Sequence, residues 1–229
     1  MQNFFSGLPG VLLIVVLSVV ASYIAISLIE HQVHQNLMHK RRLPKWAYRV
    51  WPYIMEIYEG HAVRHHGIWY RDFDFEPHPD GRHDNIDIRL VETAWLFLAF
   101  APIMLLFFAV SPIAGVVWII MGIAHDRLWN ILHNQMHMPE AVFFADWGLY
   151  RWLARHHFMH HQATNKNYNI VFPFADFVLG TVSKPRFRDL REMMRLGYLK
   201  PKSSRAKARL EAIRTKVEYS RRPLVEATV

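Results

Sequence analysis

Histidine is the residue type that this sequence concentrates most clearly. The stretch RHHFMHHQATNKNY, residues 155–168, holds four histidines within six residues, and the chain contains 15 in all. Others form the motifs HX4H, HX3HH and HX3H, and the last group completes the series with HX2HH. Imidazole ligates metals and carries protons near neutral pH, so clustered histidines first indicate a metal site. His78, His83 and His125 stand outside these motifs, and we interpret them as ordinary interfacial residues.

Helical spacing suits most of these motifs. Residues three or four positions apart share one face of an α-helix, where two ring nitrogens can hold one metal. Three sets have this spacing: His133/His137, His61/His65 and His157/His160/His161. His34 and His39 do not, because five residues rotate by roughly 140°. Either that helix ends or distorts there, or the two reach different metals; His31 and His34 form a competing pair.

Ten motif histidines are too many for a single metal ion. A catalytic zinc uses about three protein ligands plus water, whereas two metals with four or five imidazoles each account for ten. Cysteine is absent, which excludes thiolate zinc sites, iron–sulfur clusters and Cys-ligated haem. Imidazole suits zinc, copper, iron and nickel, so ligand type alone leaves the metal open.

The elements that must position these residues are helices. Residues 8–29 carry no charge, and at about 1.5 Å per residue they span the roughly 30 Å of a bilayer core. We expect a retained transmembrane helix, because a signal peptide needs a basic start and a clear cleavage site. A second apolar block, 91–110, is interrupted at Ser111-Pro112 and resumes over 113–124. This pattern predicts a helical hairpin with its turn near Pro112.

Three further helices are predicted over 45–66, 139–161 and 203–217. The second opens with Pro-Glu, and the third is basic and amphipathic. Residues 70–87 are acidic, contain Pro-Asp-Gly and predict a loop. The predicted fold class is an all-α integral membrane protein, with three to four transmembrane helices and a cytoplasmic histidine-rich cap. Residues 1–182 would form the membrane di-metal domain, and 183–229 a basic cytoplasmic tail.

Charge orients the predicted spans. The net charge is +8, and residues 184–229 hold 14 Lys and Arg against 5 Asp and Glu. The basic segment 39–49 directly follows the first apolar stretch, so the positive-inside rule places it in the cytoplasm. The N-terminus then lies outside, and the histidine motifs and tail lie inside, as in a bacterial inner membrane. The tail suits an anionic membrane face or a nucleic acid.

A polar metal cage beneath a membrane bundle suits a substrate that arrives from the bilayer. The C–H bonds of lipids are attacked by metal-activated O₂, which is iron or copper chemistry, since zinc is not redox-active.

The order HX4H, HX3HH, HX3H, HX2HH resembles the fatty acid hydroxylase/sterol desaturase superfamily of membrane di-iron oxygenases. The segment NYNIVFPFADFVLGT, residues 167–181, is similar to the closing pattern of that family. The resemblance covers roughly residues 25–182. It implies two irons bound only by histidine, O₂, and electrons from a separate ferredoxin or cytochrome donor. Carried over by position, the ligands are His34, His39, His61, His65, His66, His133, His137, His157, His160 and His161.

One departure concerns the second motif, which is usually HX2HH in that family. Here three residues follow His61, so His61 is the least secure ligand of its motif. His39 stays in the set because of the resemblance, despite the helical geometry. Further residues are candidates for supporting the ligands or contacting substrate: His31, His156, Asn167, Tyr168 and Asp176. No fused cytochrome b5 domain is recognisable, so electrons must come from outside.

The resemblance implies an oxidoreductase, a monooxygenase that hydroxylates an unactivated C–H bond of a fatty acyl chain, a sterol-like lipid or a polar lipid. A carotenoid-ring hydroxylase or a lipid desaturase of the same superfamily is the alternative within this class. A membrane metal or haem carrier is a non-enzymatic alternative, although carriers place ionisable residues near the bilayer midplane. A nucleic-acid partner would leave the histidines unexplained, so we expect none.

Overall fold

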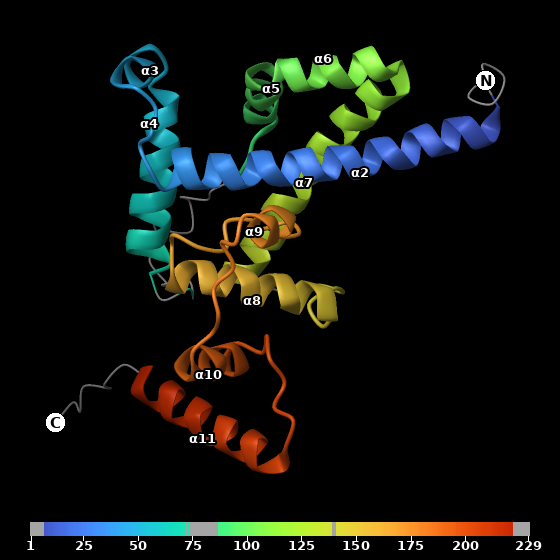
Figure 1. The fold of residues 1–229 in the computed structure, drawn as a ribbon. Coiled ribbons are helices and arrows are strands. Elements are labelled where there is room, and N and C mark those ends of the chain that lie inside the picture. Colours follow the sequence, from blue (N-terminus) through green and yellow to red (C-terminus); the bar gives the residue numbers. More distant parts are fainter. Residues whose placement is uncertain (1–6, 72, 74–86, 139–140, 222–229) are drawn as a thin grey trace.

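The computed structural model describes residues 7–71, 73, 87–138 and 141–221, with side chains up to residue 212. These residues form helices, turns and loops only, which confirms the all-helical prediction for this part of the chain. Helix α2, Leu8–Val33, continues without a break into the π-helix η1, His34–Met38 (Figure 1). Within the described residues, Leu8–Met38 is the one helix that is long and apolar enough to cross a membrane by itself.

The second apolar block is bent. Helices α5, Leu90–Ala99, and α6, Ala101–Val110, meet at 74° and pass the same membrane test only when they are taken together. Pro102 in the first turn of α6 has no N–H for the helical ladder, so α5 cannot continue through it. The number of spans, predicted as three to four, therefore stays a prediction.

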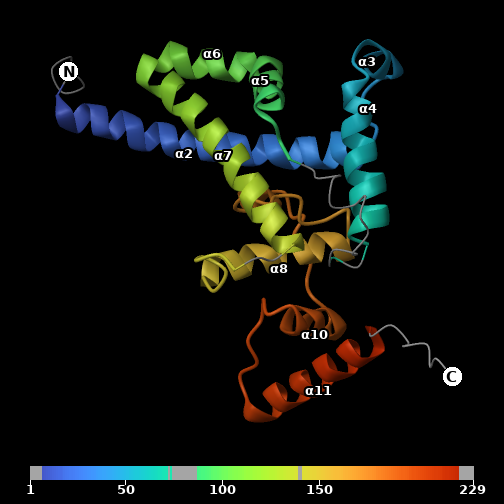
Figure 2. The ribbon, with the colours of Figure 1, turned by 180° about the vertical axis from the view of Figure 1, so that it is seen from behind.

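The turn of the hairpin lies where the sequence places it. Ser111 caps helix α7, Pro112–His137, and its side chain accepts a hydrogen bond of 3.2 Å from the Ile113 N–H. Helix α6 packs closely on α7, because a Cβ atom at Gly115 would lie 2.2 Å from the Phe108 ring. Helix α7 then crosses α2 and carries its last turns toward the histidine-rich end of the molecule (Figures 1 and 2).

The helix predicted over 45–66 is broken into pieces. The structure has α3, Lys45–Val50, then α4, Tyr53–Tyr58, then the π-helix η2, Glu59–Trp69. Trp51 is not helical, because the proline that follows it disfavours helical backbone at the preceding residue. The predicted loop 70–87 lies mostly outside the described residues.

Of the later helices, α11, Ser204–Arg221, confirms the helix predicted over 203–217, whereas the helix predicted over 139–161 begins later. Helix α8 is Gly148–Gln162. Short turns and an extended Trp147 precede it, so the predicted helix start at Pro139 is wrong. Residues 139–140 themselves lie outside the described residues. Three helices follow: α9, Phe174–Val178; α10, Phe187–Arg195; and α11, Ser204–Arg221. Tyr198 donates a hydrogen bond of 2.8 Å to the Met136 carbonyl, and Met193 joins the same core. The first part of the predicted tail therefore packs against α7 and α8.

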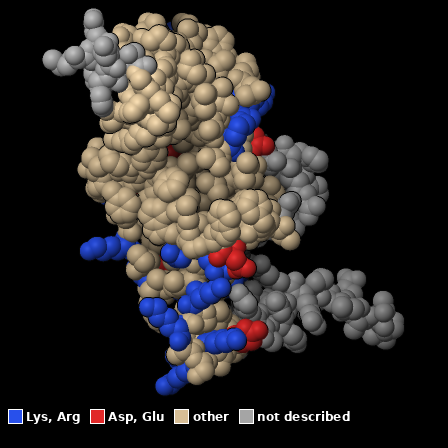
Figure 3. Space-filling model, turned by 90° about the vertical axis from the view of Figure 1, so that its right-hand side faces the viewer, with Lys and Arg blue, Asp and Glu red and all other residues tan. Residues whose placement is uncertain are grey.

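The surface divides by polarity. Leucines and valines along the first half of α2 are exposed, as are apolar residues of α6 and the start of α7. Figure 3 shows that most of the upper part of this face lacks charged side chains, whereas Lys and Arg gather below, over α10 and α11. A contiguous exposed apolar surface of this kind is typical of contact with a membrane or a partner.

Candidate metal centre

The structure brings all ten motif histidines together. Nine form two groups in which the potential ligand nitrogens lie within 4.8 Å of one another. Group A is His34, His39, His61, His66 and His160, and group B is His65, His137, His157 and His161. The His133 ring lies beside group B, with its centroid 4.8 Å from those of His65 and His157. Its buried Nε2 has no hydrogen-bond partner, so His133 is available as a fifth nitrogen for group B.

The sequence motifs do not correspond to the two groups. The α-helical spacing of His61 and His65 would allow them to hold one metal, but the structure places His61 in group A and His65 in group B. Both lie in η2, whose π-helical hydrogen bonds join residues five positions apart. The wider turn places His61 and His66 on the same side. The HX2HH motif is divided in the same way: His160 belongs to group A, whereas His157 and His161 belong to group B.

A π-helical turn also resolves the conflict over His34 and His39. The His39 N–H donates to the His34 carbonyl at 3.0 Å, a bond between residues five apart. The two rings stack with centroids 5.1 Å apart and planes inclined by 21°. The helix is therefore distorted between them, which was one of the open alternatives, and both side chains reach group A.

Backbone carbonyls fix the direction of the ligand rings. Four imidazoles donate from Nδ1 to a carbonyl: His34 to Tyr168, His160 to Lys166 at 2.7 Å, His137 to Phe73 at 2.8 Å, and His161 to Tyr70 at 3.1 Å. A carbonyl oxygen only accepts, so Nδ1 carries the proton in each of these rings. Their Nε2 atoms therefore hold lone pairs that point toward the centre of each group, which is the form of histidine that binds metal.

A cation would satisfy the lone pairs that converge in each group. Three Nε2–Nε2 pairs are at or below 2.9 Å: His34/His61 and His137/His157 at 2.8 Å, and His39/His160 at 2.9 Å. A ring whose proton is on Nδ1 has none on Nε2 to donate, so the Nε2 atoms of His34 and His160 can only accept. A metal ion at each group would accept all of these lone pairs. The donor set thus fits metal ions with nitrogen ligands.

Burial keeps the imidazoles neutral. It lowers the pKa of His160 to about 4 and that of His137 to about 3, although their carbonyl partners oppose the shift. Burial and neighbouring histidines hold the pKa well below its usual range for His61, His65, His66, His133, His157 and His161. Only a neutral imidazole ligates a metal, so the groups are ready for metal at neutral pH.

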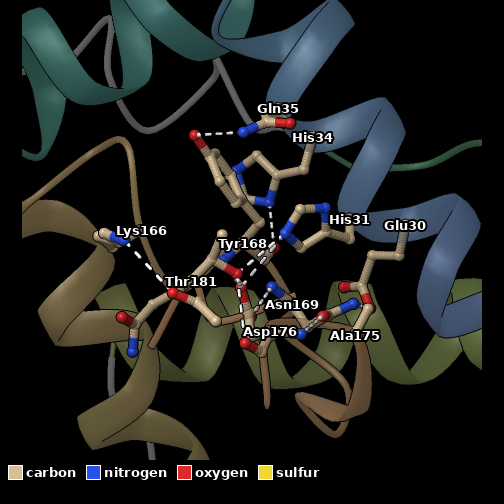
Figure 4. Close-up of polar contacts among 12 residues, drawn as sticks. Glu30, His31, His34, Gln35, Lys166, Tyr168, Asn169, Ala175, Asp176 and Thr181 are labelled. Carbon is tan, nitrogen blue, oxygen red and sulfur yellow. Dashed lines mark hydrogen bonds and ion pairs between the residues drawn. The ribbon is translucent and has the colours of Figure 1, made fainter. Parts of the chain in front are cut away.

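A loop organised by Asp176 supports group A (Figure 4). Its carboxylate is fully buried and accepts four hydrogen bonds. The donors are Tyr168 N at 2.9 Å, Asn169 N at 2.8 Å, Thr181 Oγ1 at 2.6 Å and His156 Nε2 at 2.9 Å. This network holds the segment 166–169, whose carbonyls orient His34 and His160.

The other predicted supporting residues lie in the same network. His31 is not in either group; its Nε2 lies 3.0 Å from Thr181 Oγ1. Asn167 donates to His156 Nδ1 at 2.9 Å and adopts a left-handed backbone with φ of 54°. Tyr168 is completely buried, with its ring 5.8 Å from that of His160. These residues lie next to the histidines of group A.

Sequence reasoning missed two contacts that support the site. Glu30 in α2 accepts hydrogen bonds of 2.8 Å from both Asn169 Nδ2 and the Ile170 N–H, which ties α2 to the loop. The sequence feature that could have indicated Glu30 is its position as the first charged residue after the apolar stretch 8–29. Trp129 stacks on His133 with ring centroids 4.3 Å apart and planes inclined by 25°.

An apolar cavity of about 100 Å³ leads to the histidines. It lies between α2, α5 and α7, with walls formed largely by aliphatic and aromatic side chains such as Ile29, Val33, Leu96 and Phe97. His34, a member of group A, lines it directly, and Trp129 connects it to His133. The cavity therefore adjoins group A.

No protein-family model matches the chain, and searches of curated proteins and of solved structures likewise give no match.

Proposed function

We propose that this chain is a membrane-bound di-iron oxygenase that hydroxylates an unactivated C–H bond of a lipid. The observation that carries the proposal is the pair of histidine groups at the end of an apolar cavity, with Nε2 lone pairs converging in each. The resemblance of the four histidine motifs to the fatty acid hydroxylase/sterol desaturase superfamily supports the same conclusion.

The number of ligands favours iron over zinc. Zinc is almost always four-coordinate in protein sites and has no redox chemistry. Group A offers five imidazoles, and imidazole also suits iron. The two groups are immediate neighbours, since the rings of His66 and His161 have centroids only 4.1 Å apart. Two metals at these positions would act on the same substrate.

Bound iron would supply the activation of O₂ and the oxidation of a C–H bond, with one oxygen atom inserted and the other leaving as water after uptake of two electrons and two protons. The protein residues have three tasks. The carbonyls of Tyr168 and Lys166 hold the rings of His34 and His160 in group A. The Asp176 network holds those carbonyls. The apolar cavity orients the alkyl chain and keeps water away.

Membrane attachment and partners belong to the same proposal. Helix α2 would cross the bilayer with the N-terminus outside, and the bent pair α5–α6 would enter it from the cytoplasmic face, as in a bacterial inner membrane. Helices α10 and α11 expose Arg186, Arg188, Arg191, Lys207 and Arg209. This basic surface suits anionic headgroups, which attract each basic residue by about 1 kcal/mol near the surface. Electrons would come from a ferredoxin-type or cytochrome-type donor protein.

The experiment measures metal content and lipid products together. The protein is purified from iron-supplemented cells, and lipids of expressing cells are compared with those of cells that express a His160→Ala variant. We expect two irons per chain and a lipid that gains one oxygen, absent with the variant. A lipid that loses two hydrogens would replace hydroxylation with desaturation. Metal binding without any change in lipids would refute the oxygenase and favour the metal carrier.

A further inference from the structure

The apolar cavity has a polar wall. His125 and Asp126 of α7 line it, as does Glu30 of α2, which also holds the loop beside group A. His125 Nε2 lies 3.3 Å from Glu30 Oε2, and His125 Nδ1 lies 3.4 Å from Asp126 Oδ1. Glu30 is held by Asn169, as Figure 4 shows. Ionisable groups in a membrane-adjacent apolar cavity are costly, and they mark a functional site by default.

Trp118 adds a further polar group to the same cavity. Its side chain lines the space, the residue is only 3% exposed, and its indole N–H has no hydrogen-bond partner. Indole nitrogen donates and never accepts. A buried donor without a partner is rare in folded proteins and calls for a ligand or water that offers an acceptor oxygen.

These groups follow one face of α7. Trp118, Gly122, His125 and Trp129 recur at intervals of four, three and four residues, and all four line the cavity. At about 1.5 Å per residue, Trp118 lies about 16 Å from Trp129, and His125 lies about 6 Å from it. The cavity therefore runs along α7, with its polar positions set back from the histidine groups.

We propose that the cavity takes up the part of a lipid chain that carries a hydroxyl, and that the indole N–H of Trp118 recognises this group. The hydroxyl oxygen accepts from this unpartnered N–H, whereas both ring nitrogens of His125 already face carboxylates and a plain hydrocarbon offers no acceptor. Burying a polar group beside hydrocarbon without a hydrogen bond is unfavourable. The inference rests on the proposed function only in assigning this lipid as the substrate.

Photo-crosslinking in native membranes tests the inference without turnover. Two probes of equal length carry a diazirine at the same carbon; one is a long-chain alcohol and the other an alkane. We expect the alcohol to label peptides of α2 and α7 about tenfold more than the alkane, the ratio that one net hydrogen bond gives. Trp118→Phe should lower alcohol labelling toward the alkane level and leave alkane labelling unchanged.

The control is Trp95→Phe, the same chemical change at a residue that is 44% exposed and does not line the cavity. Iron content of each variant shows that the protein has folded. Equal labelling by both probes, or alcohol labelling that Trp118→Phe does not lower, would overturn the inference. Preference for the alcohol without any lipid oxidation in cells would sustain it while refuting the oxygenase. Oxidation of lipids in cells with no preference for the alcohol probe would support the oxygenase and overturn the inference.

Discussion

Asp176 is the residue through which the loop and group A are most tightly connected, so Asp176→Asn is an informative variant. Oδ1 accepts from Tyr168 N and Thr181 Oγ1, and Oδ2 accepts from Asn169 N and His156 Nε2. Asparagine retains one oxygen and presents an NH₂ group in place of the other. The Asn169 N–H and the His156 Nε2–H, which donate to Oδ2, then face the NH₂ group, which is itself a donor.

The magnitude follows from those two bonds. A hydrogen bond to a charged group contributes about 1.5–3 kcal/mol, so the variant loses about 3–6 kcal/mol. This is a large part of the roughly 5–15 kcal/mol by which a domain is stable. Displacing the carbonyls that orient His34 and His160 should weaken the group A metal by about 10–100-fold, which is about 1.4–2.8 kcal/mol. Group B is oriented by the Phe73 and Tyr70 carbonyls instead and should keep its affinity.

The assay is an iron titration of the purified variant, with bound metal measured at each free concentration. One of two binding steps should weaken while the other stays unchanged. Thr181→Val, which removes a single 2.6 Å hydrogen bond, is a milder test in the same direction. Asp189→Asn is the matched control, because Asp189 is equally buried but caps α10. Equal weakening of both steps, or of neither, would refute the assignment of the loop to group A.

Three other variants test the site, the cavity and the tail. His61→Ala should remove the group A iron whereas His31→Ala should not, as metal analysis would show; loss in both would contradict the grouping. Gly122→Ala places a Cβ 2.6 Å from Phe97 Cζ and should displace that ring into the cavity, lowering lipid turnover at unchanged iron content, with Gly148→Ala as control. Truncation after Lys202 removes α11 and should weaken salt-sensitive binding to anionic vesicles; unchanged binding would exclude this role. This truncation keeps Thr181, which donates to Asp176.

Residue type and order determined much of the candidate site. Ten histidines without a cysteine restrict the ligands to nitrogen and oxygen. Their helical spacing predicted that they would meet, and the structure brings all ten together. Composition also predicted the all-helical class and the apolar helix that starts at Leu8. These features follow from local periodicity and side-chain chemistry, which are present in the sequence itself.

The division of ligands between the two groups depends on local geometry that spacing does not show. The rule for α-helices paired His61 with His65, but the wider π-helical turn in η2 pairs His61 with His66. The same kind of turn in η1 brings His34 and His39 together. No composition signal marked either π-helix, and a change in helical turn alters which residues share a face.

Tertiary structure alone decided what surrounds the ligands. The carbonyls of Phe73, Tyr70, Lys166 and Tyr168 orient four imidazoles, and a backbone carbonyl has no signature in the residue type. The contact of Glu30 with the Asn169 amide joins residues 139 positions apart. His125 looked like an ordinary interfacial residue, and only the packing of α2 against α7 placed it beside a carboxylate in an apolar cavity. The sequence by itself determined the ligand chemistry, because that resides in side chains; the arrangement around it arises from contacts between distant segments, which only the folded chain brings together.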